Sequence, residues 1–240
     1  MEADYPLDTE PATPEYVLAV LQYFDQFSVT FGEPLTFDTT VEEWDFSWEL
    51  RPPVEHGRAI NQYWSIQVPE EEWARLLDTR QPYTLRDVCN KIAEHARRPV
   101  IRPCRIAGVS CRPAGAFLTI RSLLASAGAD VSRLTPSSSL NELSRSLYPK
   151  LDDIIKLAPT ELPRIRFSQP LFNLITILAV ISWSANIPLY FWGPTSLFVS
   201  NLLLTAVLYG VSQWIAKLPP RRIDIGDLKT FRDLSVLIAN

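Results

Sequence analysis

The side chains with the richest chemistry in this sequence are three cysteines and a nearby histidine. Cys89, His95, Cys104 and Cys111 could together bind zinc, because thiolates and imidazoles are its usual protein ligands. The spacing of Cys104 and Cys111, with six residues between them, is not that of a zinc knuckle, and only one histidine is close in sequence. We therefore expect separate, reduced thiols, with no metal site and no disulfide.

A second candidate is His56, which follows Glu55 and could act as a base paired with an acid. No serine or cysteine nucleophile is tied to it by spacing, so a surface or capping histidine is the simpler interpretation. The sequence also contains no Walker motif and no G-x-G-x-x-G pattern. No catalytic residue is predicted, and we expect the protein not to be an enzyme.

Charge is divided unevenly along the 240 residues. Residues 1–78 carry 17 acidic and 3 basic side chains, whereas residues 79–240 carry 10 acidic and 20 basic ones. Nucleic acid is not an expected partner, because no nucleic-acid-binding motif accompanies the basic residues. The densest basic stretch is expected to contact anionic lipid headgroups or the acidic N-terminal region, through Arg97, Arg98, Arg102, Arg105 and Arg112.

A long uncharged interval lies between Arg166 and Lys217. It contains two apolar runs, about 171–191 and about 196–216, separated by a Trp-Gly-Pro-Thr turn. Helices of roughly 20 residues span a hydrocarbon core of about 30 Å, and they pair their own backbone polar groups. The sequence predicts a two-helix transmembrane hairpin. The alternative is a buried core hairpin of a soluble protein.

Basic residues flank this interval on both sides, whereas the turn between the runs carries no charge. By the positive-inside rule both termini face the cytoplasm, and no signal-peptide pattern begins the sequence. We expect a multi-pass protein of a bacterial-type cytoplasmic (inner) membrane. The flanking residues expected at the membrane surface are Arg164, Arg166, Lys217, Arg221 and Arg222.

Polar, uncharged residues lie within the two runs. Because no ionisable group accompanies them, a proton relay or a coupled transporter is not expected, and anchoring is the predicted role. The expected partners are the lipid bilayer and either another protein or a second copy of the chain. Hydrogen bonds between the two helices, or between hairpins of different copies, are expected from Asn173, Ser182, Ser184, Asn186, Asn201 and Gln213.

Helical periodicity dominates the rest of the chain. One helix starts after Thr13-Pro14, another is expected at 114–127, and the proline-containing stretch 97–113 is interpreted as an extended connector. Three segments begin with a capping hydroxyl followed three positions later by an acid, at Thr84, Ser139 and Thr230. Residues 84–93 align without gaps with 230–239, which indicates either an internal repeat or the residue pattern that capped helices commonly share.

The order of these features in the first hundred residues resembles an acyl carrier protein. A helix at 14–27 precedes a loop through Thr39-Thr40, then Asp45-Phe46-Ser47-Trp48 leads into a second helix, and Tyr63–Glu72 is similar to that family's Phe-x-Ile-x-Ile-Pro-x-Glu stretch. The resemblance implies a helical bundle and phosphopantetheine on Ser47. The family's Asp-Ser-Leu motif is altered here, because Phe46 is inserted, Trp48 replaces leucine, and Pro52-Pro53 interrupt the modification helix.

A second, partial copy of the same pattern is predicted from Phe117 through Leu143, with the Thr230 helix as its last helix. On this interpretation the membrane hairpin is an insertion within the second copy. The segments around Leu143 and Thr230, far apart in the chain, would then lie together.

The predicted fold is therefore all-α, with small carrier-like helical bundles and a two-helix transmembrane hairpin. The predicted function is a non-enzymatic helical interaction module presented to the cytoplasm, without a cofactor. The alternative is a membrane-tethered carrier or accessory factor for acyl or peptidyl intermediates. The predicted segments are an acidic N-terminal domain 1–97, a basic domain 98–166, the hairpin 171–216, and a C-terminal helical segment 217–240.

Overall fold

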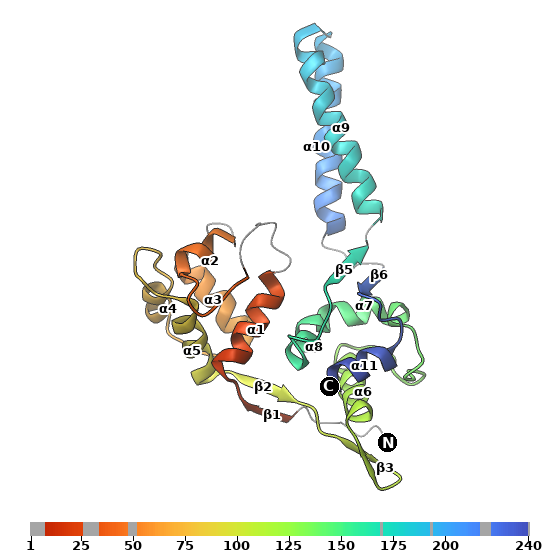
Figure 1. Ribbon diagram of the computed structural model, residues 1–240. Helices are drawn as coiled ribbons and strands as arrows, with labels where there is room; N and C mark the ends of the chain where they lie inside the picture. The colour runs from red at the N-terminus through yellow and green to blue at the C-terminus, as the bar shows by residue number, and fades with distance from the viewer. Residues whose placement is uncertain are drawn as a thin grey trace.

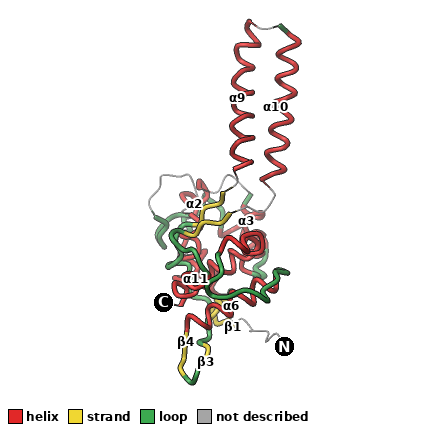
Figure 2. Tube along the Cα trace, turned by 90° about the vertical axis from the view of Figure 1, so that its right-hand side faces the viewer, coloured by secondary structure: helices red, strands yellow, loops and turns green. Residues whose placement is uncertain are grey.

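The computed structural model describes residues 8–25, 34–47, 52–168, 170–192, 194–216 and 222–239. The chain is mostly helical, with 63% helix and 12% strand, which confirms the helical class. Two helical units form the body, and a pair of long helices projects from it (Figure 1). The perpendicular view in Figure 2 shows the same projection.

The N-terminal unit is built from amphipathic helices around one apolar core. Helix α1 begins at Pro14, whose fixed φ and missing N–H suit the first helical turn, and it buries Val17, Val20 and Leu21. Strands at the two ends of the unit pair antiparallel, with Asp8 opposite Val100. The elements are β1 (Asp8–Pro11), α1 (Pro14–Asp25), α2 (Val41–Ser47), α3 (Pro53–Trp64), α4 (Glu70–Leu76), α5 (Leu85–His95) and β2 (Arg97–Val100).

The C-terminal unit has a second core, to which elements on both sides of the long helices contribute. The last helix packs on α6, so the segment predicted at 217–240 shares a core with the helices of 98–166. Tyr23 of α1 also lies in this core. The elements are β3 (Cys104–Ile106), β4 (Val109–Cys111), α6 (Arg112–Ser126), η1 (Leu140–Leu143), α7 (Ser144–Leu147), η2 (Tyr148–Lys150), α8 (Leu151–Leu157), β5 (Ile165–Ser168), β6 (Arg222–Ile225) and α11 (Phe231–Ala239).

The long helices are α9 (Pro170–Trp192) and α10 (Thr195–Ala216), which lie between β5 and β6 in the chain. These bounds lie close to the predicted runs 171–191 and 196–216. Strands β5 and β6 pair antiparallel, with Ser168 opposite Arg222, and so close the base of the helical pair. The two helices therefore leave and re-enter the C-terminal unit at neighbouring points.

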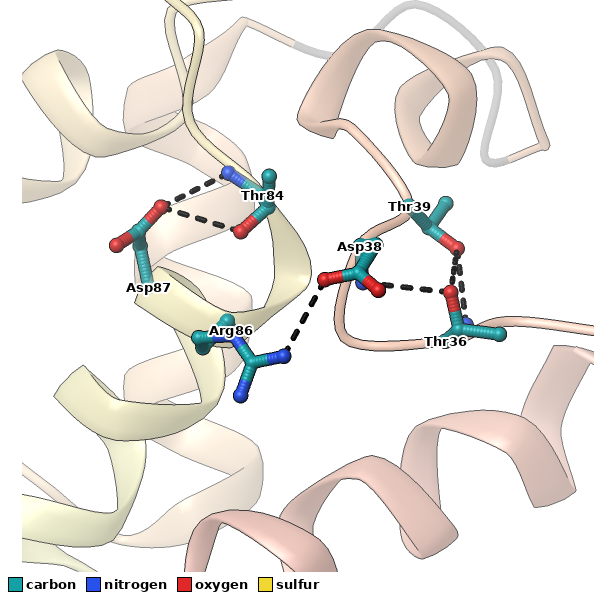
Figure 3. Close-up of polar contacts among 6 residues, drawn as sticks. All are labelled: Thr36, Asp38, Thr39, Thr84, Arg86 and Asp87. Atoms are coloured by element: carbon teal, nitrogen blue, oxygen red, sulfur yellow. Dashed lines mark hydrogen bonds and ion pairs between the residues drawn. The ribbon is translucent and has the colours of Figure 1, made fainter.

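The two units share one framework. In the N-terminal unit the loop before α2 accepts hydrogen bonds from the first turn of α5: Leu85 N donates to Thr39 O at 2.9 Å, and Arg86 N to Phe37 O at 3.1 Å. The Arg86 guanidinium also pairs with Asp38 of this loop at 3.2 Å (Figure 3). In the C-terminal unit the same two backbone bonds run from Phe231 N to Ser138 O at 3.1 Å and from Arg232 N to Pro136 O at 2.7 Å.

Helix caps and buried positions follow the same correspondence. Thr84 N donates to the Asp87 carboxylate at 2.9 Å, and Thr230 N donates to the Asp233 carboxylate at 2.9 Å. Corresponding residues of the two units lie 99 positions apart in the sequence before α4 and 146 positions apart after it. Several of these pairs are buried in both units. Such pairs include Leu18 and Phe117, Leu35 and Leu134, Val41 and Leu140, Leu85 and Phe231, Val88 and Leu234, and Ile92 and Ile238.

The change of spacing locates an insertion. Thr40 bridges Thr84, and Ser139 bridges Thr230, so the equivalent intervals are 44 and 91 residues long. The difference of 47 residues equals the number from Pro170 to Ala216. Helix α4 begins four residues after Ile66, and α9 begins five residues after the equivalent Ile165. The long helices are therefore inserted in the C-terminal unit close to the point where α4 begins in the N-terminal one.

Candidate membrane segment and basic surfaces

Helices α9 and α10 carry their large apolar side chains outward. Ile177 is 57% exposed, Ile181 60%, Trp183 63% and Leu203 64%. Contiguous apolar surface of this extent on a protein marks a membrane or a protein interaction site. Further exposed members of the set are Leu174, Val180, Ile187, Tyr190, Phe191, Leu197, Val207, Tyr209 and Trp214.

The contact between the two helices is polar. Ser182 Oγ donates to Asn201 Oδ1 at 2.9 Å and lies 2.7 Å from Thr205 Oγ1, while Asn201 Nδ2 donates to the Ser182 carbonyl at 2.7 Å. Ser182 and Thr205 are both buried. Ser182, Asn201 and Thr205 are hydrogen-bonded inside the pair while apolar groups face outward, which is the arrangement that a lipid environment favours.

The predicted inter-helix residues are only partly brought together. Ser182 and Asn201 bond across the contact, whereas Ser184 donates to the Val180 carbonyl of its own helix. Thr205 was not predicted, although it lies one turn after Asn201 on the same face. Asn173 and Gln213 are exposed near the base of the pair.

One face of the helical pair is hollowed by a groove of about 610 Å³. Its lining is apolar apart from a few hydroxyl and amide groups, and its rim includes Trp183 and Tyr209. The Thr176 hydroxyl beside it is buried and has no hydrogen-bond partner among the described residues. Because nothing encloses the groove on its open side, it offers surface for packing rather than a closed ligand site.

Helix α10 has the length and apolar composition of a membrane span. Thr195–Ile215 is apolar and long enough, and only 11% of its most apolar stretch is buried, whereas a core helix of a soluble protein would be mostly buried. The apolar part of α9, Phe172–Pro188, is shorter. Helix α10 thus meets the requirement, and a crossing by both helices stays a prediction.

The predicted basic residues divide into two groups. Arg97 Nε donates to Thr9 Oγ1 at 2.8 Å, and Arg98 forms an ion pair with Glu10. Arg102 forms an ion pair with Asp8. These three arginines therefore bind the acidic N-terminal strand, because the β1–β2 pairing brings the two segments together. The β3–β4 hairpin lies at the end of the body opposite to α9 and α10 in both views (Figures 1 and 2), and β2 precedes it in the chain.

Of the two contacts predicted for this first group, the structure shows the one with the acidic N-terminal region for Arg97, Arg98 and Arg102. Arg105 in β3 and Arg112 at the start of α6 are exposed at the same distal end. The second group lies at the base of the long helices, where Arg166 in β5 and Arg222 in β6 are exposed. Lys217 and Arg221 lie outside the described residues.

The junction between the units is centred on Lys156 of α8. Its ammonium donates to the Tyr63 carbonyl at 2.6 Å and lies 3.9 Å from the centre of the Tyr63 ring. Tyr16 and Tyr23 of α1 donate to the carbonyls of Lys156 and Pro163, at 2.8 and 3.1 Å. Burial lowers the pKa of Lys156 and raises that of Tyr23 to about 12. A charged residue among apolar neighbours in 151–157 was the available sequence signal for this contact.

The remaining candidates are dispersed. Ser47 is the last residue of α2, and the next helix begins at Pro53, so it does not start a helix as the carrier resemblance implied; its side chain lies outside the described atoms. His56 stacks on Trp44. Cys89 is buried in α5, while Cys104 and Cys111 lie opposite each other in the β3–β4 ladder as free thiols. The described residues contain no cluster of three metal-ligating side chains.

A small polar pocket of about 240 Å³ lies between α4 and α5. Lys91 lies 3.2 Å from the Glu72 carboxylate and 2.8 Å from that of Glu94. The Lys91 ammonium is therefore already neutralised by two carboxylates of the protein.

No protein-family model, no curated protein and no solved structure matches this chain. The resemblance to acyl carrier proteins therefore stays a prediction. The function has to be argued from the arrangement of the long helices and the two units.

Proposed function

We propose that the chain is a two-pass membrane protein, in which α9 and α10 both cross the bilayer and hold the two helical units on one side. The units are a non-enzymatic interaction module, and the helical pair is its anchor. Because β5 and β6 lie side by side, the helical pair leaves and returns to the same membrane surface, as a two-pass anchor requires.

The observation that carries this proposal is the inverted burial of the helical pair. Ser182 and Thr205 are buried while Ile181, Trp183 and Leu203 are exposed. Moving one large apolar side chain out of water is worth about 1.5–3 kcal/mol, so the whole exposed set favours the bilayer by an amount on the order of tens of kcal/mol. A soluble two-helix projection would leave that surface in water.

Fractionation of the full chain tests the anchor. The protein should stay in the membrane pellet after alkaline extraction, and protease added to sealed inverted vesicles should cleave both terminal regions. A soluble monomer would overturn the membrane assignment. Retention with one terminal region protected would overturn the two-pass topology but leave a single crossing.

A further inference from the structure

Exposed arginines gather on one face of the β5–β6 ladder, directly below the long helices. Along the two strands Ile165, Ile223 and Ile225 are buried, so the alternate positions, including Arg166 and Arg222, face outward. Arg164 is exposed two residues before Arg166. Asp224 lies opposite Arg166 across the ladder, so the outward face of the paired residues carries two positive charges and one negative charge.

These arginines are close to the predicted headgroup level. Arg166 lies four residues before the start of α9, and extended chain rises about 3.3 Å per residue. An arginine side chain adds several ångströms of reach and can extend toward the polar interface while its stem covers apolar surface. The face is therefore placed to meet phosphate groups if α9 and α10 span the bilayer.

The N-terminal unit provides an internal comparison. The equivalents of Arg164 and Arg166, 99 positions earlier, are Ser65 and Gln67, neither of which is charged. In that unit the short helix α4 begins shortly after these positions. Within one framework, these two arginines thus occur just before the long helices, whereas uncharged residues precede α4.

We infer that Arg164, Arg166 and Arg222 form a binding surface for the phosphate groups of anionic phospholipids. The inference rests on the proposed membrane crossing. It specifies the class of lipid that would contact the protein at the membrane surface. Guanidinium groups bind phosphate through paired hydrogen bonds, and a basic residue at an anionic surface gains about fivefold in association. Phosphatidylglycerol is the appropriate probe, with phosphatidylcholine as the zwitterionic reference.

The test uses the full chain in vesicles of phosphatidylcholine and phosphatidylglycerol, with spin-labelled versions of each lipid reporting contact with the protein. The native chain should prefer the anionic label severalfold at low salt, and the preference should fall as salt screens the charges. The variant Arg166→Gln/Arg222→Gln should lose most of the preference. Gln67 shows that glutamine is accepted at the position equivalent to 166.

A matched double variant controls for net charge. Arg105→Gln/Arg112→Gln removes two arginines from the distal end of the body and should leave the preference unchanged. Equal preference in the native chain and the Arg166→Gln/Arg222→Gln variant would overturn the inference while the protein remains membrane-bound. Failure of the native chain to enter the vesicles at all would instead overturn the proposed crossing.

Discussion

The two units share a framework, and they differ most after Ile66 and its equivalent Ile165, where the short helix α4 begins in one unit and the long helix α9 in the other. In the N-terminal unit α4 covers α3, and Trp73 packs so closely on Gly57 that a Cβ there would lie 2.4 Å from the Trp73 Cβ. In the C-terminal unit the long helices are inserted near the equivalent of the start of α4, and Lys156 stands at the position of Gly57. Lys156 is covered by Tyr63 of the other unit. The position that α4 covers in the N-terminal unit is therefore part of the contact between the units in the C-terminal one.

The largest effect on this comparison is expected from Trp73→Ala. Trp73 is fully buried and donates from Nε1 to Asn61 Oδ1 at 3.0 Å, so truncation should destabilise the N-terminal unit by about 3–5 kcal/mol. Lys156→Ala, at the junction, should cost less and leave that unit folded. Urea unfolding of the detergent-solubilised chain measures both. Equal losses would mean that the two units do not unfold separately.

Thiol labelling distinguishes the two units directly. Cys89 is fully buried and burial raises its pKa to about 12, so maleimide should modify it much more slowly than the half-buried Cys104 and Cys111. Ser235 is the equivalent buried position in α11, and Ser235→Cys would report opening of the C-terminal unit in the same way. Rapid native labelling of Cys89 would contradict its placement in the core.

The junction should weaken at alkaline pH. Burial raises the pKa of Tyr16, Tyr23 and Tyr63 above the ordinary value of 10. The separated state then loses protons first, so stability is full below pH 10 and decreases as the pH rises beyond it. Fluorescence energy transfer between labels on the two units, followed against pH, measures the separation.

Matched phenylalanine variants sharpen that test. Tyr16→Phe and Tyr23→Phe each remove a hydrogen bond to the other unit, worth about 1 kcal/mol. The Tyr63 hydroxyl is buried without a partner among the described residues, so Tyr63→Phe should not weaken the junction. A larger loss from Tyr63→Phe than from Tyr23→Phe would contradict the geometry of the contact.

Effects of a similar size, confined to single helices, are expected from the two helix caps. Thr84→Ala and Thr230→Ala remove equivalent caps and should each cost about 1 kcal/mol, because the backbone N–H of Asp87 or Asp233 loses its side-chain acceptor. Amide hydrogen exchange should show the loss in α5 for one variant and in α11 for the other. Spread of either effect to both helices would argue against separate units.

The sequence was most informative where one local pattern determines structure. Uncharged apolar runs located α9 and α10, and the hydroxyl–acid caps at Thr84 and Thr230 correctly marked equivalent helices. The expected meeting of the segments around Leu143 and Thr230 is found in the bond from Leu140 N to Lys229 O. That expectation followed from treating the long helices as an insertion.

Other features depend on contacts between distant residues. The strands of β1 and β2 have four residues each and include prolines, so neither has a clear local signal. Because these strands pair, Arg98 lies opposite Glu10 and forms an ion pair with it. The Lys156 junction likewise requires that α8 meet α3 of the other unit, which no local periodicity specifies.

Deletion of Pro170–Ala216 tests the central claim most directly. Ser168 and Arg222 are paired at the base, and the remaining six residues between them suffice for a hairpin loop. If the long helices are an inserted membrane anchor, the shortened chain should be a soluble, helical monomer that unfolds cooperatively, while the full chain stays in the membrane. An aggregated or unfolded product would show that α9 and α10 belong to the core of the C-terminal unit.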